Sequence, residues 1–190
     1  MIKATLNDKA AVISTLVKSF DTNKSVNYIV KQDSKRVERI RKLMAYSFDL
    51  CYAFGDVFLS EDRKACVLTL LPDRKKSTFK TTLMDINLVL SVIGVSSAKK
   101  AMDRDARIKK GYPSEPIVYL WFIGVDPAYQ GKGIGGTLLD DVVKHSTGLG
   151  RPVYLETSMV ENLPWYEKHG FNVYQTLDFS HGDLYCLKNA

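Results

Sequence analysis

The sequence predicts a mixed α/β (α+β) fold with one central sheet, and three observations support this prediction. Residues 117–125 form an apolar, β-branched and aromatic run that is typical of a buried strand. Residues 134–143 repeat apolar side chains at helical spacing, and residues 153–157 predict a second strand. A strand–helix–strand unit is a crossover connection, so we expect its two strands to be parallel. Short strands earlier and later in the chain should add antiparallel neighbours.

Length and composition favour one globular domain that covers residues 1–190. The N-terminus lacks a long apolar run beside a basic segment, so we expect no secretory signal. Residues 83–95, the most apolar internal stretch, contain Asp85 and Asn87 and are too short and too polar to cross a bilayer. We therefore expect a cytoplasmic protein without a membrane partner.

Net charge and cysteine content exclude few classes of ligand or partner. The formal net charge of +6 suits an anionic ligand and suits non-specific nucleic-acid binding about as well, and we expect no nucleic-acid partner. The cysteines Cys51, Cys66 and Cys186 are odd in number and lack the spacing of metal ligands. We expect reduced, mostly buried thiols and no metal.

The N-terminal part predicts two amphipathic helices. Apolar side chains recur at helical spacing over residues 8–20 and again over residues 34–54. Gly55 ends the second helix. Residues 21–32, which connect the two helices, are polar and are expected to be turn-like.

A hairpin and a long helical segment follow. Residues 56–60 and 65–71 predict two strands joined by a polar link. Residues 78–110 are mostly helical in pattern, with a break near residues 94–97. This segment carries six basic residues, which are Lys99, Lys100, Arg104, Arg107, Lys109 and Lys110. We expect them to form a solvated helix face rather than a binding patch.

The C-terminal part predicts a short helix and two closing strands. Residues 148–152 form a turn. Residues 162–169 predict a helix with Pro164 in its first turn. The closing strands are expected at residues 171–176 and 183–187.

Four glycines open the helix that follows the buried strand: Gly131, Gly133, Gly135 and Gly136. Glycine is unfavourable in helices, so this cluster makes sense if a ligand must approach the backbone closely. Free N–H groups at a helix N-terminus bind phosphate because they are unpaired donors aided by the helix dipole. The stretch therefore predicts a phosphate-binding turn.

The same glycines satisfy the dinucleotide-binding fingerprint, with Glu156 about twenty residues later as a ribose-binding acid. In that fold the first glycine follows its strand at once, whereas residues 126–130 intervene here. Only residues 157–190 remain after the acid, which is too little for the other strands of a doubly wound sheet. We therefore do not favour a dinucleotide fold.

Two motifs carry a family resemblance. Residues 130–135 (QGKGIG) resemble the Q/R-x-x-G-x-G/A motif of the GNAT superfamily of N-acetyltransferases, and residues 125–127 before them fit its acetyl-CoA site. Residues 155–158 (LETS) and 162–171 (NLPWYEKHGF) resemble the puromycin N-acetyltransferase branch. The specific resemblance covers about residues 114–187, and the N-terminal half matches only in the order of its elements.

The resemblance implies the GNAT fold, in which the two parallel central strands splay to admit acetyl-CoA. Backbone N–H groups of residues 131–136 would bind the pyrophosphate, with Gln130 shaping the turn. Lys132 would either add charge there or remain solvated. The implied acetyl-CoA contacts are Ile123, Gly124, Val125, Gln130, Gly131, Lys132, Gly133, Ile134, Gly135, Gly136 and Asn162.

Some of these contacts have an alternative explanation. The backbone at Ile123 and Val125 would pair with the pantetheine arm, and the Ile123 N–H would polarise the thioester carbonyl. Gly124 is expected to mark a bulge in the strand, the alternative being a glycine kept for packing. Asn162 would contact the arm, cap the following helix, or do both.

Two side chains are candidates for acid–base catalysis. Tyr166 matches the family's Y-x-x-x-G-F tyrosine and would protonate the departing thiolate, unless it is an aromatic core residue. Glu156 would deprotonate the acceptor amine, directly or through water, unless it forms a structural ion pair or fixes the acceptor. The glutamate base of histone-modifying members is replaced by Tyr119, which is no base at neutral pH. Three histidines are expected to be surface residues rather than catalysts: His145, His169 and His181.

The implied activity is transfer of an acetyl group from acetyl-CoA to a primary amine of a small-molecule acceptor, by direct attack in a ternary complex. An aminonucleoside-like acceptor is one option. A non-catalytic acyl-CoA-binding module is an alternative. So is a protein or peptide N-acetyltransferase, for which we expect an open, acidic groove. The oligomeric state stays open, with a homodimer as one option.

Overall fold

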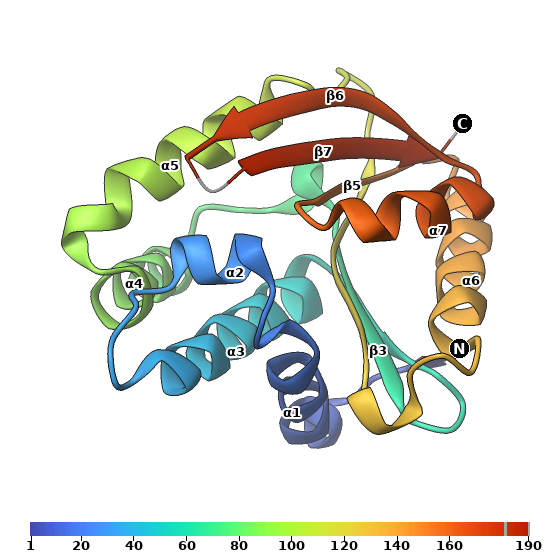
Figure 1. The fold of residues 1–190 in the computed structure, drawn as a ribbon, viewed down its shortest axis with the longest axis horizontal. Coiled ribbons are helices and arrows are strands. Elements are labelled where there is room, and N and C mark those ends of the chain that lie inside the picture. Colours follow the sequence, from blue (N-terminus) through green and yellow to red (C-terminus); the bar gives the residue numbers. More distant parts are fainter. Residues whose placement is uncertain (181, 190) are drawn as a thin grey trace.

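The computed structural model describes residues 1–180 and 182–189. A seven-stranded sheet runs through it in the order β1-β2-β3-β4-β5-β7-β6 (Figure 1). The strands are β1 (Ile2–Lys3), β2 (Gly55–Leu59), β3 (Ala65–Leu70), β4 (Val118–Val125), β5 (Val153–Thr157), β6 (Phe171–Phe179) and β7 (Gly182–Asn189). β4 and β5 pair in parallel, and the other neighbours are antiparallel. The predicted mixed class and parallel central pair are confirmed.

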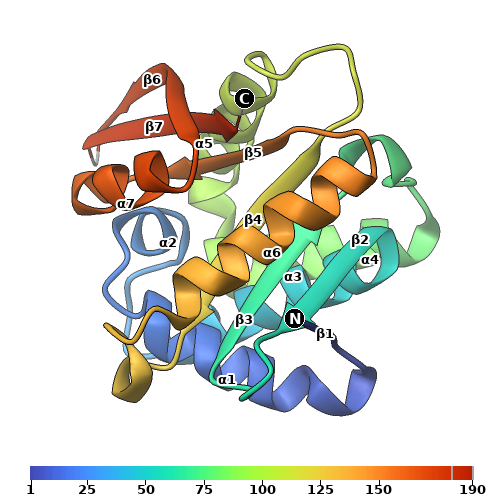
Figure 2. The ribbon, with the colours of Figure 1, turned by 90° about the vertical axis from the view of Figure 1, so that its right-hand side faces the viewer.

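Helices cover both faces of this sheet (Figure 2). They are α1 (Lys9–Phe20), α2 (Lys24–Ile29), α3 (Arg36–Phe54), α4 (Phe79–Leu88), α5 (Val95–Lys109), α6 (Ile134–Gly148) and α7 (Leu163–Lys168). Leu16 of α1 and Phe48 of α3 pack with Leu68 of β3 in one buried cluster. Leu139 of α6 and Leu155 of β5 belong to a second cluster. The sheet therefore separates two hydrophobic cores, with α6 and α7 on one side and α1 and α3 on the other.

Most elements lie where the sequence predicts them, including the hairpin of β2 and β3. The long helical segment breaks as expected, because a π-helical turn at Val89–Ile93 leads into Gly94, whose φ of +82° suits glycine. The three cysteines are buried and free, as expected. Within the described ranges no single helix is long and apolar enough to cross a membrane, although the bent pair Phe79–Ile93 and Ser97–Lys109 passes that test jointly.

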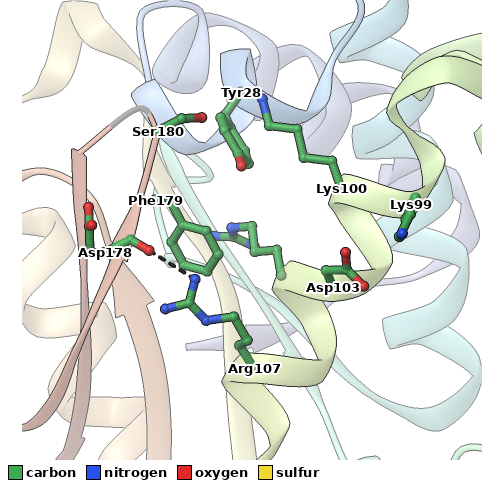
Figure 3. Close-up of a pocket in the computed structure, with 9 residues that line it drawn as sticks. Tyr28, Lys99, Lys100, Asp103, Arg107, Asp178, Phe179 and Ser180 are labelled. Atoms are coloured by element: carbon green, nitrogen blue, oxygen red, sulfur yellow. Dashed lines mark hydrogen bonds between the residues drawn. The ribbon is translucent and has the colours of Figure 1, made fainter.

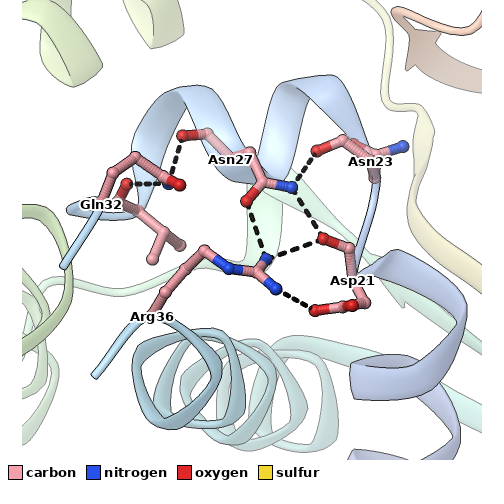
Figure 4. A network of polar contacts seen from close by, with 6 residues as sticks. Asp21, Asn23, Asn27, Gln32 and Arg36 are labelled. Carbon is pink, nitrogen blue, oxygen red and sulfur yellow. Dashed lines mark hydrogen bonds and ion pairs between the residues drawn. The ribbon is translucent and has the colours of Figure 1, made fainter. Parts of the chain in front are cut away.

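The expectation of a turn-like link at residues 21–32 is wrong, because this segment contains α2. The Asn23 side chain caps the helix by accepting a hydrogen bond from the Val26 N–H (3.0 Å). Arg36 donates to the carboxylate of Asp21 and to the side-chain oxygen of Asn27, which ties α2 to α1 and α3 (Figure 4). Six residues are too few to show helical periodicity, so capping and this network form the helix.

β4 and β5 separate soon after they begin to pair. Their register includes only Val118 with Val153 and Tyr119 with Tyr154. Beyond Tyr119, β4 therefore has an edge that β5 does not cover. This is the splayed pair that the sequence resemblance implies.

A bulge in β4, just beyond Tyr119, changes which face of the sheet the following side chains occupy. Leu68 and Thr69 of β3 pair with Phe122 and Leu120, so Trp121 is the extra residue. Phe122 packs in the core with α1, whereas Ile123 returns to the core with α6. The strand thus changes its alternation where it leaves β5.

The bulge does not lie at Gly124, so that expectation is wrong. Gly124 pairs regularly with Cys66. A Cβ at Gly124 would lie 3.0 Å from Leu16 Cδ2 and 3.1 Å from Ser19 Oγ. This glycine therefore lets α1 pack closely against β4.

Candidate active site

The N-terminus of α6 forms an open cradle of backbone amides. Gly131 and Gly133 adopt φ values of +76° and +80°, and a Cβ on either would meet no heavy atom within 4 Å. Backbone conformation, rather than crowding, therefore requires glycine at both positions. The N–H groups in the first turn of α6 have no partner within the helix. Such a helix end binds an anionic group such as phosphate.

Gly135 and Gly136 are glycines for a different reason. A Cβ would lie 3.2 Å from Val125 Cγ2 at Gly135 and 3.0 Å from the His169 ring at Gly136. These glycines let α6 approach β4 and α7 closely, so any ligand contact falls to their N–H groups. His169 packs here with its side chain 13 % exposed and its Nδ1 on Asp140. His169 is therefore a partly exposed residue that packs against α6.

Side chains brace the cradle and add positive charge to it. Gln130 Nε2 donates to the carbonyl oxygen of Val125 (3.2 Å), which ties the turn to the end of β4 and fits its predicted shaping role. Lys132 Nζ lies 5.1 Å from the Tyr129 ring centroid, and Lys64 Nζ lies 4.6 Å from the same ring. Lys64 comes from the hairpin loop, and no sequence signal linked it to the glycine turn.

The uncovered edge of β4 can accept an extended arm. The Asp126 N–H donates to the Lys64 carbonyl, toward β3. Because backbone groups alternate between the edges of a strand, those of Val125 and Ile123 point to the opposite edge. The Val125 carbonyl already accepts hydrogen bonds from Gln130 and from Ser19. The N–H groups of Ile123 and Val125 therefore remain as the donors on this edge.

Tyr166 of α7 combines a packed ring with an unpaired hydroxyl. The residue is 6 % exposed and packs edge-to-face against Trp165 and Phe171. Its hydroxyl has no hydrogen-bond partner among the residues that the structure describes. Burial, and then the charge of Glu156, raises the pKa of this phenol. Tyr166 therefore stays protonated at neutral pH, as an acid must.

Glu156 of β5 is a carboxylate with two phenol partners. Tyr119 donates to Oε2 (2.8 Å) and Tyr112 donates to Oε1 (3.3 Å). Burial raises the pKa of this carboxyl to about 7, and the phenol hydrogen bonds and the charge of Arg104 only partly oppose that rise. Glu156 forms no ion pair with any described residue, which contradicts the structural ion pair. A carboxyl with a pKa near neutrality suits a general base.

The two candidates lie on opposite faces of the sheet. Leu155 points into the core with α6, where Tyr166 also packs. Its neighbour Glu156 points the other way, toward Tyr112 and Tyr119. Acid and base thus flank the place where β4 and β5 separate. A molecule bound on the Tyr166 face and a molecule bound on the Glu156 face can meet in this gap.

A groove of about 560 Å³ opens on the Glu156 side, between α2, α5 and the end of β6 (Figure 3). Its charged lining is Lys99, Lys100, Asp103, Arg104, Arg107 and Asp178. The expected solvated face holds for the exposed side chains of Lys99, Lys100 and Arg107, whereas Arg104 is half-buried and departs from it. Arg104 lines this groove, and its charge opposes the rise of the Glu156 pKa.

Other candidates fall outside this arrangement or change role. Asn162 is exposed at the start of α7 and makes no capping hydrogen bond, so the cap alternative is wrong. His145 is half-exposed and its Nε2 lies 3.6 Å from Asp56. His181 lies outside the described residues. Among the residues that are described, no three His, Cys, Asp or Glu side chains gather as metal ligands would.

The sequence did not reveal Tyr112 or Arg104 as part of the site. Tyr112 lies in the loop before β4 and Arg104 lies in α5, and only the fold brings them to Glu156. The resemblance marks Tyr119 only as the residue that replaces the family's glutamate base, whereas in the structure Tyr119 donates a hydrogen bond to the base candidate Glu156.

Comparison with known proteins finds similarity to acetyltransferases over the central part of the chain. The Acetyltransferase (GNAT) domain family model matches residues 89–173. An uncharacterized N-acetyltransferase of Schizosaccharomyces pombe is 42 % identical over 57 residues, which are 30 % of this chain and 23 % of that protein. The mycothiol acetyltransferase of Propionibacterium freudenreichii is 34 % identical over 80 residues, 40 % of this chain and 23 % of that protein. The chain therefore spans about a quarter of the length of these curated relatives.

The solved structures agree with this on the level of the fold. The crystal structure described as histone acetyltransferase HPA2 and related acetyltransferase, from Corynebacterium glutamicum, superposes with a TM-score of 0.74. The alignment covers 99 % of this chain and 93 % of that one at 16 % sequence identity. An identity this low shows a shared fold and leaves the acceptor open.

Proposed function

We propose that this chain, whose residues 89–173 match a GNAT acetyltransferase domain, moves an acetyl group from acetyl-CoA to a primary amine. The observation that carries the proposal is the placement of Tyr166 and Glu156 on opposite faces of the sheet, beside the gap between β4 and β5. One face offers a protonated phenol, and the other offers a carboxylate that titrates near neutrality.

The residues present fit acetyl-CoA, which supplies an activated thioester when it is bound. The amide cradle at residues 131–136 suits the pyrophosphate, and Lys64 and Lys132 add positive charge beside it. The uncovered edge of β4 suits the amide-bearing arm, and the exposed side chain of Asn162 is free to contact it. We assign the Ile123 N–H the role of polarising the carbonyl, because it points to the uncovered edge of β4.

The side chains then account for the protons. Glu156 takes the proton that the acceptor nitrogen loses, directly or through water, as that nitrogen bonds to the acyl carbon. Tyr166 donates its phenolic proton to the sulfur as the carbon–sulfur bond breaks. The proton accepted on one face and the proton given on the other balance, and exchange with solvent restores both groups.

A small-molecule acceptor is favoured over a protein terminus or lysine. The groove beside Glu156 is open, but it holds more cations than carboxylates, whereas a basic peptide would need an acidic groove. The aminonucleoside option is supported only by the resemblance of residues 155–171 to the puromycin N-acetyltransferase branch.

A thiol-release assay with acetyl-CoA tests this function. The acceptors are aminonucleosides, polyamines, aminoglycosides, amino acids and peptides. We expect acceptor-dependent release of CoA with at least one small amine. Tight binding of acetyl-CoA without turnover on the whole panel would instead support the non-catalytic binding module.

Gly133→Ala should weaken acetyl-CoA binding more than it slows chemistry. A side chain at the φ of +80° costs on the order of 1–2 kcal/mol, and relief of this strain moves the amide cradle. We expect KM for acetyl-CoA to rise about tenfold with kcat nearly unchanged, as steady-state kinetics can measure.

Gly150→Ala is the matched control. Gly150 has a φ of +67° and open space around it, but it follows the far end of α6. The Gly150→Ala variant should lose a similar amount of folding stability and keep its KM for acetyl-CoA. An equal rise of KM in both variants would mean that loss of stability, and not the cradle, causes the effect.

A further inference from the structure

Two cations of the groove, which lies on the same face of the sheet as Glu156, are held in place by aromatic rings. Lys100 Nζ lies 3.5 Å from the Tyr28 ring centroid, and the Arg107 guanidinium lies 4.4 Å from that of Phe179. Arg107 also donates to the carbonyl oxygen of Asp178 (2.9 Å), as Figure 3 shows. Cations fixed in this way lose less side-chain freedom when an anion binds.

This positive charge is not neutralised within the chain. Across residues 1–180 and 182–189, none of Lys99, Lys100, Arg104 and Arg107 forms an ion pair with a carboxylate. The groove faces four cationic side chains and only the two carboxylates Asp103 and Asp178. An anionic ligand would gain from this field, and a second cation would be repelled.

Arg104 has a buried hydrogen-bond donor without an acceptor among the described residues. Its Nε is buried and has no hydrogen-bond partner among the described residues, and its Nη2 lies 3.5 Å from Ser25 Oγ. A buried guanidinium N–H without an acceptor is costly. A bound carboxylate or phosphate oxygen would supply that acceptor in the fork geometry that arginine prefers.

We propose that the acceptor is a small amine that also carries an anionic group, and that Arg104, Lys100 and Arg107 hold this group while the amine reaches Glu156. The inference rests on the proposed function and names the substrate class of the same site. Arg104 is the central contact, because it lines the groove and its buried Nε lacks an acceptor among the described residues. The same cations favour the neutral form of the bound amine, which is the form that attacks.

Anchored α2 makes the groove a preformed site. The Tyr28 ring that holds Lys100 lies on α2, which the network of Asp21, Asn27 and Arg36 fixes to its neighbours. The backbone N–H of Ser25 also donates to Ser158 Oγ (3.2 Å), next to the end of β5. The wall of the groove is thus tied to the strand that carries Glu156.

Matched acceptor pairs test the charge preference. β-Alanine is compared with β-alaninamide, and 3-aminopropyl phosphate with 3-aminopropanol, by thiol release from acetyl-CoA. We expect kcat/KM to favour the anionic member of at least one pair by about tenfold or more, and the preference to shrink as salt is added. The carboxylate and phosphate pairs tell which anionic group fits better.

Substitutions of groove residues test whether the groove causes the preference for anionic acceptors. Arg104→Gln should reduce the preference to less than about threefold, whereas Lys110→Gln, on an exposed lysine just after α5, should keep it. If Arg104→Gln fails to fold, Arg107→Gln carries the same test.

The outcomes separate this inference from the proposed function. Equal or better turnover of the neutral members overturns the inference and leaves acetyl transfer intact. An unchanged preference in the groove variants also overturns it. A protein that binds CoA but releases no thiol with any pair or any amine of the wider panel overturns the proposed function and the inference with it.

Discussion

Glu156→Gln is expected to lower kcat at pH 8 by roughly 10²-fold or more, because the variant cannot take the proton of the acceptor amine. In the protein itself the rate should rise with pH as the carboxyl, whose pKa is about 7, loses its proton. The variant should lack this limb of the pH–rate profile. An acceptor whose amine titrates well below pH 7 removes the amine's own contribution from the comparison.

The same substitution should stabilise the fold above neutral pH. The pKa of Glu156 is raised from 4.5 to about 7, so the folded protein holds this proton more tightly than the unfolded chain does. That contribution to stability is complete below pH 4.5 and is lost as the pH rises through 7. At pH 8 the variant should therefore be more stable by at most about 3 kcal/mol, and near pH 4 the difference should vanish.

Denaturant unfolding at the two pH values measures this difference. Tyr119→Phe is the control, because it keeps the carboxylate and removes a hydrogen bond that lowers its pKa. The rise of the rate with pH in the Tyr119→Phe variant should therefore occur at higher pH. A Glu156→Gln variant that is both active and destabilised at pH 8 would make Glu156 a structural residue.

Tyr166→Phe should lower kcat by about 10²-fold with little change in the affinity for acetyl-CoA, because the ring keeps its packing and only the proton donor is lost. A thioester whose thiol is far more acidic needs no proton to leave. Such a donor should restore much of the lost rate, which a merely structural defect would not allow.

Tyr174→Phe is the matched control for this variant. Its ring also packs edge-to-face and its hydroxyl is buried, but Tyr174 lies on β6 beside Tyr154 and Cys186, outside the α6 core. It should keep its kcat with both donors. An unchanged kcat in Tyr166→Phe would remove the acid assignment.

The sequence predicted the parts of the fold that repeat a period over many residues. The helices over residues 8–20 and 34–54 and the buried strand at 117–125 follow this rule. The six-residue helix α2 and the two-residue strand β1 were missed, because such short elements depend on tertiary contacts.

The motif of the site was predictable, but its surroundings were not. Glu156 could be placed on a strand, yet its raised pKa depends on burial and on phenols from two other segments. Gly124 was misread because a glycine in a strand marks either a bulge or a close neighbour, and only packing against α1 decides between them. The partial burial of Arg104 could not be predicted, because no sequence signal shows that α2 and β6 lie beside the basic face of α5.

A structure of the protein with CoA bound tests the central claim most directly. We predict that the pyrophosphate lies within hydrogen-bonding distance of the backbone N–H groups of residues 131–136, and that the arm follows β4 past Ile123 and Val125 to a thiol near the Tyr166 hydroxyl. A pyrophosphate bound elsewhere, or no binding at millimolar CoA, would contradict the account.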